Sequence, residues 1–107
     1  MTDAEFEQLT DRTLAAVERA LDRTTLDVDV QFKGEGVLEI EFSDGSKVIV
    51  NRHGAAREIW VAARSGGFHF RYTGDAWRDT RDGTELFAAL SRIVSAQSGT
   101  AVILASA

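Results

Sequence analysis

The sequence predicts an α+β fold, a two-layer α/β sandwich in which two helices pack on one face of an antiparallel sheet of about five or six strands. Three observations lead to this class. Apolar residues follow a helical period at the start of the chain, a period of two through its middle, and a helical period again near its end. Because the 107 residues contain no repeat or linker, we expect residues 1–107 to form a single domain around one core.

The first helix is predicted over residues 3–22. Its apolar side chains fall within one arc when residues are placed about 100° apart, so one side of the helix should be buried. Acidic residues spaced by four and seven positions gather on one flank. Like charges four residues apart destabilise a helix by a few tenths of a kcal/mol, so helix stability does not explain this flank. The expected buried arc is Phe6, Leu9, Thr13, Leu14, Val17, Ala20 and Leu21, and the acidic flank is Glu7, Asp11, Glu18 and Asp22.

The sheet is predicted from segments in which apolar and polar residues alternate. In the first of them Val28 and Val30 alternate with Asp27 and Asp29, which places both aspartates on the outward side. Turn residues separate the segments, and the Asp-Gly pair at 44–45 is typical of a tight hairpin. The alternation runs through residues 26–33, 38–42, 47–51, 58–64 and 68–72 and ends in a short segment around Trp77.

The second helix is predicted to begin near Asp82 or Thr84, with one of them as its cap, and to end at Gly99. Residues 101–104 are too apolar to be left in solvent, so we expect them to pack along the helices. The buried stripe of this helix should contain Leu86, Phe87, Leu90, Ile93 and Val94.

The sheet face away from the helices carries a large aromatic side chain. If the apolar residues of segments 58–64 and 68–72 face the helices, alternation turns Trp60 and His69 to the opposite side, where Asn51 also lies. An exposed tryptophan invites association and is a frequent interface anchor. The alternative explanation is a cation–π contact between Trp60 and a nearby arginine.

Charge is unevenly divided along the chain. Residues 1–44 hold twelve acidic and four basic residues, a net charge of −8, whereas residues 45–107 carry +3. An acidic region attracts cations and basic surfaces and repels nucleic acid. Carboxylates without thiolate or imidazole suit hard cations such as Mg²⁺, Ca²⁺, Mn²⁺ and iron, and a convex array of them binds weakly. The oxygen donors are Glu7, Asp11, Glu18, Asp22, Asp27 and Asp29.

Several classes of protein are disfavoured. The longest apolar runs are five residues, whereas a membrane span needs ~20, and the first residues lack the features of a signal peptide. We therefore expect a cytoplasmic protein that contacts no membrane. The net charge of −5 argues against nucleic-acid binding. Metalloprotease, phosphate-loop and Ser-His-Asp patterns are missing, and without cysteine there is no disulfide, thiolate site or thiol nucleophile.

Six segments of the chain form an ordered set that is more specific than any one of them. They are MTDAEF at the start, GVL at 36–38, DGSKVIVN at 44–51, IWVA at 59–62, GGFHF at 66–70 and WRDTRDGTELF at 77–87. In this order and spacing the sequence resembles the bacterial frataxins, the CyaY family, over essentially the whole chain.

The resemblance implies a frataxin-like sandwich that binds iron weakly at its surface, as Fe²⁺ or Fe³⁺, and acts in iron–sulfur cluster assembly. The implied partners are the cysteine desulfurase and the iron–sulfur scaffold protein, toward which the protein would be an iron donor, a regulator of the desulfurase, or both. A monomer is expected, with an iron-induced oligomer as a further state. Carried over by position, the metal ligands are Asp3, Glu7, Glu18, Asp22, Asp27 and Asp29, to which the helical spacing adds Asp11, and the partner contacts are Asn51, Trp60, His69, Glu18 and Asp22.

Two other functions are weighed against this one. A metal-independent allosteric module of the desulfurase complex would use the same surfaces and would not respond to added iron. A ferroxidase needs facing carboxylates and histidines around a buried di-iron site. Acidic residues on an outer helix flank do not supply such a site, so we do not expect an enzyme.

Overall fold

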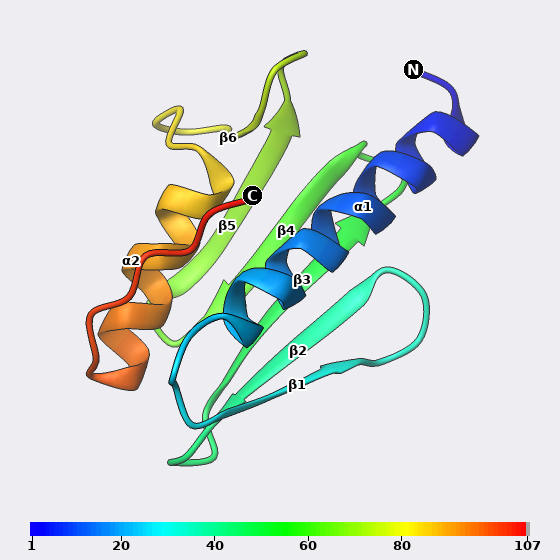
Figure 1. Cartoon of the computed structure of the whole chain (residues 1–107). Coiled ribbons are helices and arrows are strands. Elements are labelled where there is room, and N and C mark those ends of the chain that lie inside the picture. The colour runs from blue at the N-terminus through cyan, green and yellow to red at the C-terminus, as the bar shows by residue number, and fades with distance from the viewer. Residues whose placement is uncertain (107) are drawn as a thin grey trace.

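The structure, a computed structural model, describes residues 1–106, which form two helices and six strands. The strands make one antiparallel sheet in the order β1-β2-β3-β4-β5-β6. Both helices lie on the same face of this sheet (Figure 1), so the predicted two-layer sandwich is confirmed. The elements are α1 (Asp3–Asp22), β1 (Val28–Phe32), β2 (Val37–Phe42), β3 (Lys47–His53), β4 (Glu58–Ala63), β5 (Gly66–Tyr72), β6 (Trp77–Asp79) and α2 (Leu86–Ser98).

Helix α1 begins where local chemistry favours it. The Thr2 hydroxyl accepts a hydrogen bond from the Glu5 backbone N–H, and the Glu5 carboxylate accepts one from the Thr2 N–H, which together form a capping box. The buried side follows the predicted arc, except that Leu9 and Thr13 are half-buried and that Thr10 and Ala16 are buried as well. Thr10 tolerates burial because its hydroxyl donates to the Phe6 carbonyl at 2.9 Å.

Helix α2 begins later than the sequence predicts. Its N-cap is Glu85, whose carboxylate accepts hydrogen bonds from the backbone N–H groups of Phe87 and Ala88. Asp82 instead accepts from the Thr84 N–H and closes the preceding turn, so neither predicted cap residue caps the helix. The helix ends as predicted, with Gly99 in the left-handed conformation at φ 76°.

The C-terminal residues run along α2, as predicted. The Ser91 hydroxyl donates to the Leu104 carbonyl and accepts from the Leu104 N–H, and Ser95 does the same for Val102. These side-chain hydrogen bonds satisfy backbone N–H and C=O groups of a segment that is not part of the sheet. Leu104 is consequently buried, whereas Ile103 points outward and is 89% exposed.

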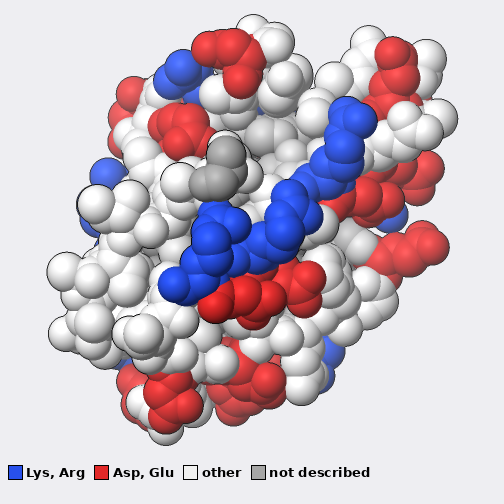
Figure 2. Space-filling model, viewed as in Figure 1, with Lys and Arg blue, Asp and Glu red and all other residues white. Residues whose placement is uncertain are grey.

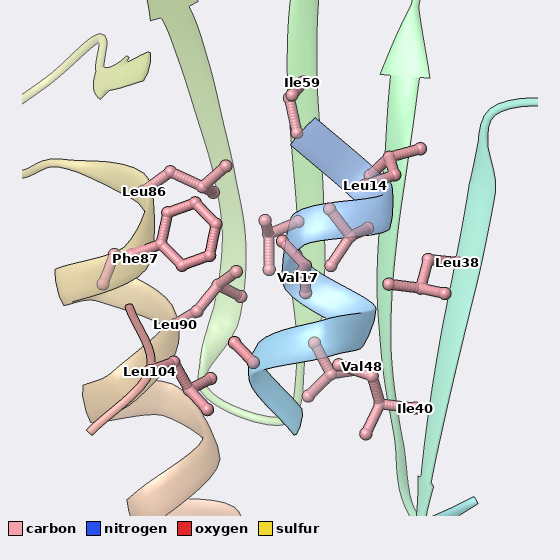
Figure 3. Packing of buried hydrophobic residues seen from close by; sticks show 14 of the residues in the cluster. Leu14, Val17, Leu38, Ile40, Val48, Ile59, Leu86, Phe87, Leu90 and Leu104 are labelled. Carbon is pink, nitrogen blue, oxygen red and sulfur yellow. The ribbon is translucent and has the colours of Figure 1, made fainter. Parts of the chain in front are cut away.

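The core lies between the helices and the inner face of the sheet. Figure 3 shows Leu14 and Val17 of α1 meeting sheet residues on one side and α2 on the other. Phe32 lies opposite Leu38 on this inner face but is 45% exposed, because β1 is an edge strand with a neighbour on one side only. Neither helix of residues 1–106 has the length and apolar content to span a membrane. The labelled core residues are Leu14, Val17, Leu38, Ile40, Val48, Ile59, Leu86, Phe87, Leu90 and Leu104.

Candidate metal-binding ridge and docking face

The predicted metal ligands lie along α1 and the start of the sheet, and we call them the acidic ridge. Their side chains point to solvent, with Glu18 half-buried and the others exposed. The structure divides the ridge into two parts that differ in their basic neighbours. The ridge comprises Asp3, Glu7, Asp11, Glu18 and Asp22 of α1, Asp27 in the connection before β1, and Asp29 of β1.

The first part of the ridge is paired with arginines from the end of β3 and the β3–β4 turn. Arg52 at the end of β3 places Nη1 2.7 Å from Asp11 Oδ1 and Nη2 3.6 Å from Glu7 Oε1. Arg57 in the β3–β4 turn lies 2.6 Å from Asp3 Oδ1. The ridge therefore has counter-ions at the start of α1, and a cation would have to displace them there.

Arg52 reaches α1 because strand alternation turns it toward the helices. Its neighbours Asn51 and His53 point to the outer face, while Arg52 lies opposite Ile59 on the inner face. The side chain passes over Gly36, where an added Cβ would come within 2.6 to 2.9 Å of Arg52 side-chain atoms. Gly36 also has φ +71°, so both the space and the backbone at this position favour glycine.

Replacing Gly36 by alanine is expected to lower the free energy of unfolding by about 1–3 kcal/mol, because a strained φ adds to the displacement of Arg52. Gly34→Ala is the matched control, since Gly34 has φ +82° and an added Cβ there would meet no atom within 4 Å. The control should lose only about 1 kcal/mol. Urea unfolding of both variants measures the difference, and equal losses would contradict a role for Arg52.

The second part of the ridge is free of such pairing. Among residues 1–106, no ion pair involves Glu18, Asp22, Asp27 or Asp29. Figure 2 shows a band of Lys and Arg side chains that runs diagonally across this face, with acidic side chains beside it. The carboxylates of the four unpaired residues are therefore available to a cation. Within the described chain, however, no three His, Asp or Glu side chains are close enough to hold a metal ion together.

The outer sheet face is centred on a stack of three rings. Trp60 of β4 lies between His53 of β3 and His69 of β5, with ring centroids 3.8 and 4.3 Å away and ring planes within 9° and 8° of parallel. Asn51, Trp60 and His69 form one row across the strands, as predicted. The alternative of an arginine over the Trp60 ring is wrong, because the imidazoles cover both faces of the indole.

Glu58 is hydrogen-bonded to the central ring of this stack. It is 5% exposed, and its Oε1 accepts a hydrogen bond from Trp60 Nε1 at 2.8 Å while its Oε2 accepts one from Arg71 Nη2 at 2.6 Å. The Trp60 hydrogen bond, followed by the Arg71 hydrogen bond and charge, lowers the pKa of Glu58 from its usual value of 4.5 against the opposing effect of burial. Glu58 is therefore an ionised carboxylate within the sheet face.

Acid is expected to destabilise the domain in part through Glu58. Because its pKa is lowered by folding, its carboxylate contributes stability above about pH 4.5, and this contribution is lost as the pH falls through the folded-state pKa. Glu58→Gln does not titrate. The free energy of unfolding of the wild type should therefore fall relative to that of the variant as the pH drops below about 4.5 and through the folded-state pKa. Urea unfolding at several pH values measures this, and parallel curves would contradict it.

Three residues of these surfaces were not singled out by the sequence patterns. Arg52 and Glu58 follow from alternation, which places Arg52 between two outward residues and Glu58 on the same side as Trp60. The stacking of His53 on Trp60 depends on the strand register, which the residue pattern alone does not give. The sheet face thus contains more fixed structure than a lone exposed tryptophan.

The fold and the two surfaces define a small α+β sandwich of the frataxin type. A solved frataxin from Psychromonas ingrahamii superimposes with a TM-score of 0.88 and 32% identity, covering 96% of this chain and 97% of that one. A trimeric frataxin from Saccharomyces cerevisiae matches with a TM-score of 0.66 and 22% identity, over 94% of this chain and 88% of its own. The second match bears on the fold alone.

Sequence relatives give the family. Residues 1–100 match the family model of the frataxin-like domain. Proteins named iron–sulfur cluster assembly protein CyaY are 54% identical in Dechloromonas aromatica, over 97% of this chain and 99% of that protein, and 53% identical in Janthinobacterium sp. strain Marseille, over 97% and 96%. The chain belongs to this family, the bacterial frataxins or CyaY proteins, so the resemblance inferred from the sequence is confirmed.

Proposed function

We propose that this chain is an iron-binding protein of iron–sulfur cluster assembly that acts as an iron donor, as a regulator of the cysteine desulfurase, or in both roles. The names of its relatives support the process. One observation carries the iron part of the proposal. Glu18, Asp22, Asp27 and Asp29 have no basic partner within the described chain, whereas the carboxylates at the start of α1 do.

Iron binding at this end of the ridge should be weak. Carboxylate oxygens suit a hard cation, but fewer than three protein ligands are close enough to act together within residues 1–106. Water would therefore complete the coordination of each ion. The trimeric yeast frataxin is a complex with ferrous iron, and we propose the same cation for this chain on the chemistry of its carboxylates. We accordingly propose iron as a loosely held cargo.

The partners proposed are the cysteine desulfurase and the iron–sulfur scaffold protein. The row formed by Asn51, Trp60 and His69 offers a docking face with an aromatic anchor at its centre. Glu18 and Asp22 offer a second contact, to a basic partner surface. Because the two surfaces lie on opposite sides of the sheet, a partner complex would hold the protein at two separate places.

Iron affinity of paired variants tests the proposal. Glu18→Gln/Asp22→Asn removes two unpaired carboxylates and should weaken Fe²⁺ binding by at least about threefold in anaerobic calorimetry. Asp3→Asn/Asp11→Asn is the matched control, because it removes two carboxylates of the same helix that already have arginine partners. It should leave the affinity within about twofold. Equal weakening by both variants would contradict a site at the end of the ridge.

A metal-independent regulator is the second candidate function, and the lack of a three-ligand cluster in the described chain favours it. In that case neutralising the ridge weakens binding to the desulfurase in a salt-dependent way, while Fe²⁺ changes neither binding nor desulfurase rate. Measuring the desulfurase rate with and without Fe²⁺ in the same preparation separates the two functions.

We propose no enzymatic step for this chain. Both of its histidines lie on the outer sheet face beside Trp60, whereas the ridge carboxylates of α1 lie on the helix side. A ferroxidase site of facing carboxylates and histidines is therefore not formed by the ridge. We further propose a cytoplasmic monomer, with iron-induced association as a state that sedimentation with and without Fe²⁺ would detect.

A further inference from the structure

Neighbouring side chains contact both faces of the Trp60 indole and its N–H group. His53 and His69 cover the two faces of the indole. The indole N–H donates a hydrogen bond to Glu58 Oε1, and this oxygen also lies 3.7 Å from His69 Nδ1. Glu58 Oε2 in turn accepts a hydrogen bond from Arg71. The His53 ring is anchored in turn, because its Nδ1 accepts a hydrogen bond from the Ala56 N–H at 3.2 Å.

We infer that Glu58 is a positioning residue for Trp60. Its buried carboxylate holds the indole between the two imidazoles. A partner therefore meets the hydrocarbon edge of a ring stack that is already assembled. This inference rests on the proposed docking role of the sheet face. Fixing a side chain before binding removes the entropy cost of ordering it in the complex.

The arrangement also limits the chemistry of the partner. A cation cannot lie on the indole face, because an imidazole already covers each side. A carbonyl or carboxylate of the partner cannot accept the indole N–H unless it displaces Glu58. The free edge of the ring is apolar. The site on the partner that receives Trp60 is therefore an apolar slot on a protein surface, not an acidic or cationic group.

Two variants of Glu58 test the positioning role. Glu58→Leu removes the acceptor at similar volume, and Glu58→Gln keeps an oxygen that can accept the indole N–H. In the free protein, hydrogen exchange of the Trp60 indole N–H, assigned with Trp60→Phe, should accelerate in Glu58→Leu and stay near the wild-type rate in Glu58→Gln. Affinity for the desulfurase–scaffold complex should fall roughly three- to tenfold in the leucine variant and be largely restored in the glutamine variant. Glu41→Leu, an outer-face control on β2, should change neither.

Unchanged indole exchange in Glu58→Leu, or equal losses of affinity in the leucine and glutamine variants, would overturn the inference. A second measurement needs no variant. On addition of the partner, the wild-type Trp60 indole N–H should keep its slow exchange and its hydrogen-bonded chemical shift, because Glu58 remains its acceptor. Transfer of this N–H to a partner acceptor would overturn the inference. If Trp60→Ala binds the partner like wild type, the docking proposal fails, while the exchange measurement in the free protein still decides the role of Glu58.

Discussion

Replacing Ile59 by alanine is expected to lower the free energy of unfolding by about 2–5 kcal/mol. Ile59 is fully buried on the inner face of β4 and points toward the helices (Figure 3). The truncation removes buried methyl and methylene groups and leaves a cavity that close-packed neighbours fill only in part. Domains of this size are stable by about 5–15 kcal/mol, so urea unfolding followed by circular dichroism should show a large shift of the midpoint.

Ile49→Ala is the matched control for this variant. Ile49 is the same residue type one strand away, but it lies half-buried on the outer face opposite Ala62. Its truncation should lower the free energy of unfolding by less than about 1 kcal/mol. A larger loss for Ile49 than for Ile59 would mean that the two faces of the sheet are assigned the wrong way round.

Trp60→Ala is expected to leave the fold intact and to weaken binding to the cysteine desulfurase complex by about 2 kcal/mol or more, which is roughly 30-fold in Kd. Trp60 follows Ile59 directly, yet it lies on the outer face and contacts His53, His69 and Glu58 rather than the core. Its removal therefore deletes the proposed interface anchor without creating a core cavity. Binding by calorimetry and thermal unfolding of the same sample measure the two effects.

The control for Trp60→Ala is Ile103→Ala. Ile103 is also a large apolar side chain, and at 89% exposure it is the more exposed of the two, but it lies in the C-terminal segment beside α2. Loss of any exposed apolar residue would weaken non-specific association, whereas only Trp60 belongs to the proposed docking face. Similar binding losses for both variants, or unfolding of Trp60→Ala, would count against the assignment.

Most of the fold could be predicted because its determinants are local. The period of apolar residues defines α1 over Asp3–Asp22, and alternation assigns each strand residue to a face. The cap of α2 was predicted wrongly because three candidate side chains lie within four residues. The Asp82 carboxylate accepts a hydrogen bond from the Thr84 N–H inside the turn. Which side chain caps α2 therefore depends on how that turn closes, and in the structure it is Glu85.

The charge pairing of the ridge could not be predicted in the same way. The arginines closest in sequence to the acidic residues, Arg12 and Arg19, form no ion pair with them within residues 1–106. The ion pairs instead come from Arg52 and Arg57, which are 41 and 54 residues away from Asp11 and Asp3. Only the packing of α1 over the end of β3 brings these groups together. The sequence could show that carboxylates share a helix flank but not which of them remain unpaired.

The most direct test of this account is an anaerobic titration of the ¹⁵N-labelled protein with Fe²⁺, followed by the loss of amide signals through paramagnetic broadening. The carboxylates at the end of α1 and the start of β1 are unpaired. We therefore expect the amide signals near Glu18, Asp22, Asp27 and Asp29 to broaden first. Signals near Asp3, Glu7 and Asp11 should persist to higher iron, since Arg52 and Arg57 already neutralise that end. Broadening that starts there, or that affects all amides alike, would contradict the account.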